Sequence, residues 1–268
     1  MNNNAIGVFD SGLGGLTAVK EIMKKLPCED VVYFGDTGRV PYGSRSAETL
    51  YKYVTQNIRF LKTFNIKMIV IACGTVSTVV LPVLDEKDVP VCGVVSEAAK
   101  VSVMETKNNK IGVIATQGTI NSGAFEKSIK ALSSDAEVYS VACPLFVPLV
   151  ENGHISSEMA YLAAEEYLTP LKEKGIDTLI LGCTHYPLLT KTIQDIMGDG
   201  VKLINSGEQV VNYVKRYLEE NDMLTDKDTP GNYSYYVSDA TFEFEKQGSL
   251  FLGRDIKGLV KRIDIDRY

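Results

Sequence analysis

The chain has 268 residues, of which 45% are hydrophobic and 23% are charged, and its formal net charge at pH 7 is −6. This length allows one large domain or two of ordinary size with a substantial core. The acidic balance and the lack of a run of Lys and Arg exclude the basic stripe that nucleic-acid binding needs, so we expect no nucleic-acid partner.

Short β-rich apolar runs alternate with longer segments of helical period. In chain order the runs predict strands over residues 5–9, 30–34, 68–72, 89–95, 110–115, 138–142, 178–181, 202–204 and 234–237. Several of these runs are apolar throughout, as expected when helices cover both faces of a parallel sheet. The alternation predicts a doubly wound α/β fold.

Two of the intervening segments predict amphipathic helices with defined ends. The first has apolar residues at positions 16, 19, 22, 23 and 26 and stops at Pro27. The second begins at a Ser46 cap and buries positions 50, 53, 54, 58 and 61. Ligands in such folds bind beyond the carboxyl ends of the strands, so the residues after each strand are the candidates for a site.

Cys73 and Cys183 follow two of these strands in matching contexts. In both places three large apolar residues and one small residue lead to the cysteine, and a residue with a hydroxyl or imidazole group follows within two positions. A lone Cys at such a place is usually a core residue, but two in the same context favour reactive thiols, whose anionic form a helix N-terminus stabilises. One thiol on either side of a trapped substrate would remove a proton from one face of a carbon and deliver another to the opposite face, which inverts a stereocentre.

The other cysteines, Cys28, Cys92 and Cys143, lack this context, and we interpret them as structural. The five cysteines include no CxxC pair, and the only histidines are His154 and His185. We therefore expect neither a disulfide framework nor a metal site.

The N-terminus lacks the charged and long apolar regions of a signal peptide. The longest apolar stretch, residues 68–84, is interrupted by polar residues and Pro82, and it is too short and too polar to span a bilayer. We expect a cytoplasmic protein without membrane contact.

The loop after the first predicted strand begins with Asp10 and Ser11 and continues with glycines at 12, 14 and 15. This spacing differs from GxGxxG, so a small ligand is favoured over a dinucleotide. Asp10 and Ser11 would point at that ligand, where Asp10 would receive an ammonium group or help a cysteine to exchange its proton. A helix N-cap is the alternative role for Asp10.

The second strand is followed by a turn-rich segment, residues 35–44, that could fold over a pocket and offer backbone N–H groups to a carboxylate. For Arg39 in this segment we expect a structural salt bridge. Further along, Thr116 and Thr119 follow a strand, and their hydroxyls also suit a carboxylate. Glu151 and His185 are candidates to tune the Cys183 thiol.

Five motifs, spread over nearly the whole chain, resemble in this order those of the glutamate racemases of the aspartate/glutamate racemase superfamily. They are GVFDSGLGGLT from position 7, GDTGRVPYG from 35, IACGT from 71, CPLFVPLVE from 143 and LGCTHYP from 181. The resemblance implies two pseudo-symmetric α/β domains, residues 1–96 with 206–268 and residues 97–205, and an active site in the cleft between them. It implies interconversion of L- and D-glutamate without a cofactor, which supplies D-glutamate for peptidoglycan, and it is compatible with a homodimer.

The resemblance also assigns roles to residues of this chain. It makes Cys73 and Cys183 the acid/base pair, with Asp10, Glu151 and His185 assisting proton transfer. The implied substrate contacts are Asp10, Ser11, Tyr42, Gly43, Gly74, Thr75, Thr184 and His185.

Two positions depart from the family pattern. Gly74 stands where the family usually has an Asn whose amide contacts the substrate, and Asn205 stands where many relatives have Asp. A lost polar contact in a dry site costs about 1–3 kcal/mol. Gly74 therefore keeps open a racemase of the same superfamily that acts on aspartate or a hydantoin. A binding or regulatory protein without catalysis is a third reading, against which the presence of both cysteines argues.

Overall fold

The computed structural model describes residues 2–268, apart from the side chain of Ser44. The chain forms two compact units: the first holds the residues up to Gly93 and Val210–Tyr268, and the second holds Val94–Gln209. This division falls directly before helix α4 (Val94–Glu105) and within helix α10 (Ser206–Glu220). The boundaries expected from the sequence, near residues 96 and 206, lie in the same two helices.

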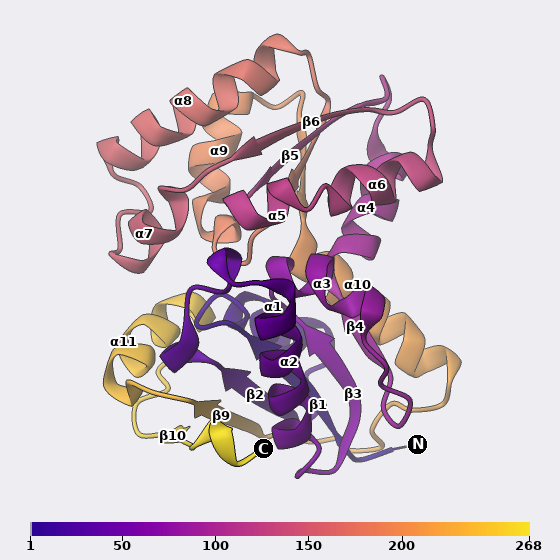
Figure 1. The fold of residues 1–268 in the computed structure, drawn as a ribbon, viewed down its shortest axis with the longest axis vertical. Helices are drawn as coiled ribbons and strands as arrows, with labels where there is room; N and C mark the ends of the chain where they lie inside the picture. The colour runs from indigo at the N-terminus through magenta and orange to yellow at the C-terminus, as the bar shows by residue number, and fades with distance from the viewer. Residues whose placement is uncertain (1) are drawn as a thin grey trace. The chain divides into compact units, whose positions relative to one another are not determined.

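The first unit is built on a six-stranded sheet with the order β10-β9-β2-β1-β3-β4, in which every pair of neighbours is parallel (Figure 1). Its last two strands come from the C-terminal part of the chain, after the second unit. The strands are β1 (Ala5–Asp10), β2 (Val31–Gly35), β3 (Ile66–Ile71), β4 (Val91–Gly93), β9 (Tyr233–Val237) and β10 (Val260–Arg262).

The second unit has a four-stranded parallel sheet with the order β6-β5-β7-β8. Its strands are β5 (Lys110–Ala115), β6 (Glu137–Ala142), β7 (Thr178–Leu181) and β8 (Lys202–Asn205). The two parallel-sheet α/β units confirm the predicted fold class, and all nine predicted strands form, with small shifts at their ends. The strand that was not predicted, β10, has three residues, of which two are exposed, so it carries little apolar signal.

The helices follow the strands as the sequence predicts. α1 ends before Pro27, and α2 begins after Ser46, whose hydroxyl accepts the backbone N–H of Thr49 at 3.2 Å. Besides α4 and α10, the helices are α1 (Leu16–Lys25), α2 (Ala47–Leu61), α3 (Gly74–Val79), α5 (Gln117–Asn121), α6 (Ala124–Leu132), α7 (Phe146–Glu151), α8 (Glu158–Glu173), α9 (Thr190–Met197) and α11 (Thr241–Leu252).

The two faces of the first sheet are covered by different helices. On one face the apolar side of α2 packs with Phe9 and Phe34 into one buried cluster. Because neighbouring residues of a strand point to opposite faces, Tyr33 turns to the other face, where its ring lies 6.0 Å from that of Phe244 in α11. α1 reaches the same place: a Cβ on Gly248 of α11 would lie only 3.0 Å from Leu16. Glycine at 248 thus allows close approach of these two helices.

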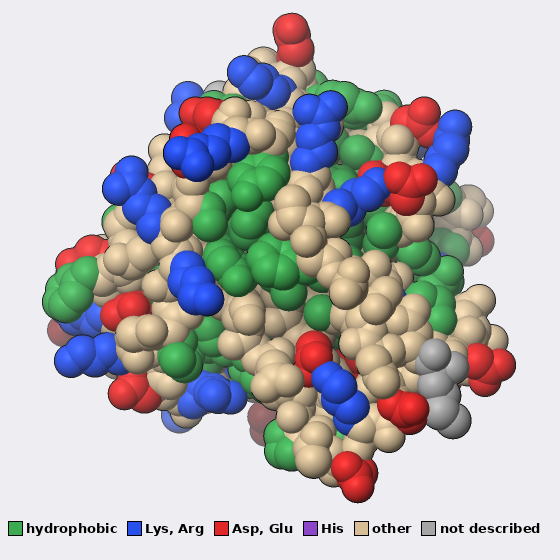
Figure 2. All heavy atoms as spheres, turned by 90° about the horizontal axis from the view of Figure 1, so that it is seen from below, with side chains coloured by type: hydrophobic (Ala, Val, Ile, Leu, Met, Phe, Trp, Pro, Cys, Tyr) green, Lys and Arg blue, Asp and Glu red, His purple; other side chains and the backbone are tan. Residues whose placement is uncertain are grey.

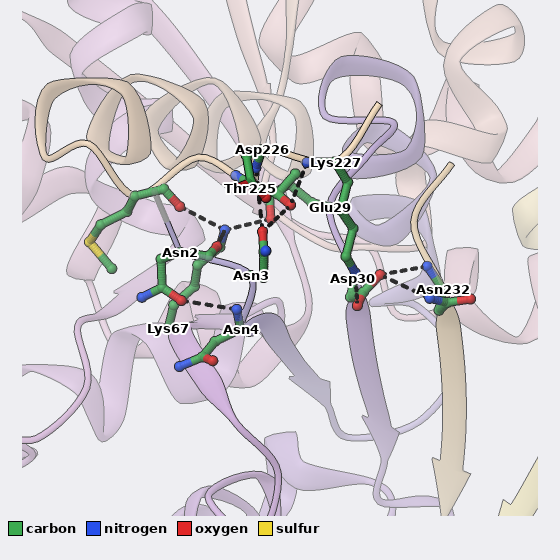
Figure 3. Close-up of polar contacts among 11 residues, drawn as sticks. Asn2, Asn3, Asn4, Glu29, Asp30, Lys67, Thr225, Asp226, Lys227 and Asn232 are labelled. Atoms are coloured by element: carbon green, nitrogen blue, oxygen red, sulfur yellow. Dashed lines mark hydrogen bonds and ion pairs between the residues drawn. The ribbon is translucent and has the colours of Figure 1, made fainter. Parts of the chain in front are cut away.

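A buried ion pair lies at the N-terminal ends of the segments that form β2 and β3 in the first unit. The ammonium of Lys67, at 0% exposure, is 2.6 Å from the carboxylate of Glu29, at 2% exposure. Lys67 also donates to the carbonyls of Asn2 and Met223, each at 2.7 Å, and Glu29 accepts the backbone N–H of Thr225 at 2.9 Å. Figure 3 shows these polar groups between the N-terminal residues and the segment that follows α10. They attach the returning C-terminal part of the chain to the start of the sheet.

Among residues 2–268, no helix combines the length and the apolar character needed to cross a membrane. On the face drawn in Figure 2, hydrophobic side chains gather near the centre, with Lys, Arg, Asp and Glu side chains around them. The apolar area on this face is therefore bounded by charge.

Candidate functional site

In the first unit Asp10 ends β1 with its side chain only 2% exposed. Its carboxylate accepts the backbone N–H of Gly15 at 3.0 Å and that of Gly12 at 3.4 Å. Gly15 directly precedes α1, so Asp10 satisfies an amide at the start of that helix, close to the N-cap role that the sequence allowed. The same bonds hold the glycine loop closed around the carboxylate.

Cys73 lies two residues beyond β3, directly before α3, and is 7% exposed. Its sulfur is 3.9 Å from the hydroxyl oxygen of Ser11, which follows the neighbouring strand β1. The structure thus brings Asp10, Ser11 and Cys73 to one edge of the sheet, as the carboxyl ends of adjacent parallel strands require. Thr75 is buried in the first turn of α3, after Gly74.

Tyr33, which the sequence did not suggest as a site residue, stabilises the loop that follows Asp10. Its hydroxyl donates to the carbonyl of Gly12 at 2.7 Å. Burial raises the pKa of Tyr33 well above 10, and the neighbouring Asp10 and Cys73 add to that rise. The phenol therefore stays neutral and continues to donate, which fixes the loop that follows Asp10.

We expect Gly15→Ala to impair both stability and activity. A Cβ there would lie 2.7 Å from the Cβ of Asp10 and 3.1 Å from that of Ala72, so Asp10 or the loop must move. Overpacking of this kind costs about 1–3 kcal/mol, measurable by urea unfolding, and kcat/KM should fall with it. Gly200→Ala is the matched control, since a Cβ at Gly200 meets nothing within 4 Å. Equal unfolding free energies for the two variants would contradict this expectation.

The segment after β2 is held by a buried carboxylate, Asp36. The guanidinium Nε of Arg39 donates to Asp36 at 2.7 Å, which confirms the predicted structural salt bridge. The hydroxyl of Tyr42 also donates to Asp36, and it accepts the side-chain amide of Asn57 at 3.2 Å. Tyr42 is 2% exposed, so its hydroxyl serves this network. Gly43, the other substrate contact expected in this segment, is exposed.

In the second unit Cys183, His185 and Glu151 form a chain of contacts. The sulfur of Cys183, two residues beyond β7, is 3.9 Å from Nδ1 of His185, and Nε2 of His185 is 3.0 Å from the carboxylate of Glu151 at the end of α7. Thr184 lies beside them, with its hydroxyl 3.5 Å from the same Nδ1. Burial alone would lower the pKa of His185, but the hydrogen bonds with Cys183 and Glu151 raise it to about 10.

Thr116 and Thr119 meet at the end of β5, where their hydroxyl oxygens are 3.1 Å apart. Cys143, at the end of β6, is fully buried, and burial together with the charge of the nearby Cys183 raises the pKa of its thiol. Its burial agrees with the structural role predicted for it. Among residues 2–268, no three His, Cys, Asp or Glu side chains are grouped so that they could hold a metal ion.

Asn205, one of the two departures from the family pattern, has a structural role. Its side-chain oxygen accepts the backbone N–H of Gly207 at 3.0 Å and of Glu208 at 3.3 Å, at the start of α10. Asn and Asp cap helices about equally well, so this replacement keeps the start of the helix intact.

The two sheets and the strand-end thiols define an α/β enzyme whose side chains can accept and donate protons. The sequence model of the Asp/Glu/Hydantoin racemase family matches residues 20–214. The chain is 46% identical to a glutamate racemase of Geobacter metallireducens, over 93% of each chain, and 43% identical to one of Thermoanaerobacter pseudethanolicus, over 100% of each. The solved structure of a Francisella tularensis glutamate racemase in complex with D-glutamate matches with a TM-score of 0.92 at 39% identity, over 100% of both chains. The chain belongs to the Asp/Glu/hydantoin racemase family and is an enzyme of the isomerase class.

Proposed function

We propose that this protein interconverts L- and D-glutamate without an added cofactor, with Cys73 and Cys183 as its two acid/base groups. The observation that carries the proposal is that each unit presents a cysteine at the end of a parallel strand beside polar partners, Ser11 in one unit and His185 in the other. Full-length relatives named glutamate racemase support glutamate over aspartate as the substrate.

In the proposed reaction one cysteine, as a thiolate, removes the α-proton of glutamate, and the other, as a thiol, protonates the opposite face. The roles exchange in the reverse direction, so activity needs one thiolate and one thiol and has a pH optimum set by the pair. His185, whose Nε2 is 3.0 Å from the carboxylate of Glu151, assists proton transfer at Cys183 together with that carboxylate. Asp10 assists the exchange of protons at Cys73.

The developing negative charge on the substrate needs hydrogen-bond donors, because no cofactor withdraws electrons from the α-carbon. We propose that hydroxyl and backbone N–H groups at the strand ends supply them and bind the carboxylates. The proposed contacts are Asp10, Ser11, Tyr42, Gly43, Gly74, Thr75, Thr116, Thr119, Thr184 and His185.

Solvent exchange tests this proposal directly. In D₂O and without cofactor, the protein should exchange the α-hydrogen of both L- and D-glutamate with deuterium, which proton NMR detects. Exchange on aspartate but not on glutamate would shift the assignment to another substrate of the superfamily. No exchange on either amino acid would reject the proposal.

We expect Gly74→Asn to lower the KM for glutamate by about tenfold, because the amide would add a hydrogen bond to the substrate in a dry site. Initial rates of racemisation over a range of glutamate concentrations measure this change. Gly74→Ala is the control, since it adds a side chain without a polar group. An increase in KM with Asn would contradict the role assigned to this position.

We propose that the protein is cytoplasmic. Within residues 2–268 none of the five cysteines is joined in a disulfide, which is typical of a reducing compartment, and this supports a cytoplasmic protein that supplies D-glutamate for peptidoglycan. Assembly as a homodimer is a prediction that analytical ultracentrifugation would test.

A further inference from the structure

The segment between β2 and α2 is tied down at several points, although it contains only short helical turns. Asp36, at 0% exposure, binds Arg39 and Tyr42 with one carboxylate oxygen and accepts the hydroxyl of Ser238 at 2.8 Å with the other. Ser238, directly after β9, in turn accepts the backbone N–H of Gly38 at 2.8 Å. The segment is thereby fixed to the ends of two neighbouring strands.

Side chains of helix α2 also bind this segment, through Arg39. The guanidinium of Arg39 donates to the side-chain oxygens of Gln56 at 2.5 Å and Asn57 at 3.1 Å, and its centre lies 4.1 Å from the ring centroid of Tyr53. Gln56 and Asn57 are themselves buried. A planar fork of donors with three acceptors is specific to Arg, since the ammonium of Lys cannot reproduce this geometry.

Between these anchors the segment rests on the loop that follows Asp10. A Cβ placed on Gly12 would meet the side chain of Val40 at 3.3 Å, so Val40, although 46% exposed, contacts Gly12. Gly12 is in turn held by the hydroxyl of Tyr33. The Tyr42-Gly43 turn therefore follows a residue that is packed on the Asp10-Ser11 loop.

We propose that Asp36, Arg39 and Asn57 are positioning residues, which hold the Tyr42-Gly43 turn in place so that its backbone N–H groups bind a substrate carboxylate. The inference rests on the proposed racemase function. A turn that is already ordered loses little conformational entropy when the substrate binds, so the network acts on affinity. The hydroxyl of Tyr42 points into the network, where it fixes the backbone of its own residue.

Tyr42→Phe isolates this effect, because it keeps the buried ring and removes only the hydroxyl that joins Asp36 to Asn57. We expect the KM for both enantiomers of glutamate to rise about tenfold, with kcat within about twofold of the unaltered protein. Arg39→Lys, which keeps the charge and loses the fork, should raise KM further. Ser238→Ala, which removes one outer anchor, should give a smaller rise and serves if the other two variants do not fold.

The matched controls are Tyr51→Phe and Arg59→Lys, two exposed positions of α2, in which KM should not change. The midpoint of thermal unfolding is measured for every variant, because a purely structural role would lower it together with kcat and leave KM unaltered. An unchanged KM in all three network variants, with normal exchange by the unaltered protein, would overturn the inference alone. No exchange on glutamate by the unaltered protein would overturn the proposed function and the inference with it.

Discussion

Cys73→Ala and Cys183→Ala should each reduce kcat for racemisation of glutamate by at least about 10³-fold, within the range that general acid/base groups contribute. In the proposed two-base reaction each direction uses both sulfurs, one to accept the proton and one to donate it. Because each cysteine serves one face of the α-carbon in this reaction, neither should compensate for the loss of the other. Circular dichroism of the glutamate solution over time measures the conversion of either enantiomer.

The same variants test which face each cysteine serves. A variant with one cysteine left should still remove and return the α-proton of a single enantiomer, so in D₂O it should label one enantiomer without forming the other. Cys73→Ala and Cys183→Ala should label opposite enantiomers. Cys28→Ala is the control, because Cys28 is half-buried and lies outside both groups of site residues. Near-normal racemisation by either active-site variant would refute the two-base reaction.

Local patterns in the sequence predicted well where the strands of both sheets end and which residues follow their carboxyl ends. An apolar run that ends in Asp10, Cys73 or Cys183 identifies a strand and its carboxyl end at the same time. In a parallel sheet those ends lie at one edge, so the approach of Ser11 to Cys73 follows from the topology. The salt bridge of Arg39 was predictable because its partner, Asp36, is three residues away.

Partners that are distant in the sequence could not be predicted in this way. Tyr33 reads as one more apolar position of β2, and only its contact with Gly12 shows that its hydroxyl supports the site. Asn57 lies within an amphipathic helix, where a buried amide has no local signature. The roles of these polar groups depend on tertiary contacts, and local patterns in a single sequence do not predict such contacts.

The pair of Lys67 and Glu29 is the clearest case of such a long-range contact (Figure 3). Burial lowers the pKa of Lys67, although the hydrogen bond and the charge of Glu29 act to raise it. Removing a charge from water costs on the order of several kcal/mol per ion. The attraction between the two charges offsets that cost only while both are present. The pair therefore contributes little net stability over an apolar pair, yet each charge depends on the other.

Lys67→Met should lower the free energy of unfolding by about 3–5 kcal/mol, the usual effect of leaving one buried charge without its partner. Glu29→Leu should have a similar effect, and the double variant should recover most of the loss, since it leaves neither charge buried. Urea unfolding followed by circular dichroism measures all three. Lys62→Met is the control, because Lys62 pairs with Glu86 and the exposed Asp88 near the surface, where ion pairs stabilise little. Additive losses in the double variant would show that the two side chains stabilise the fold independently, through the carbonyls of Asn2 and Met223 and the amide of Thr225.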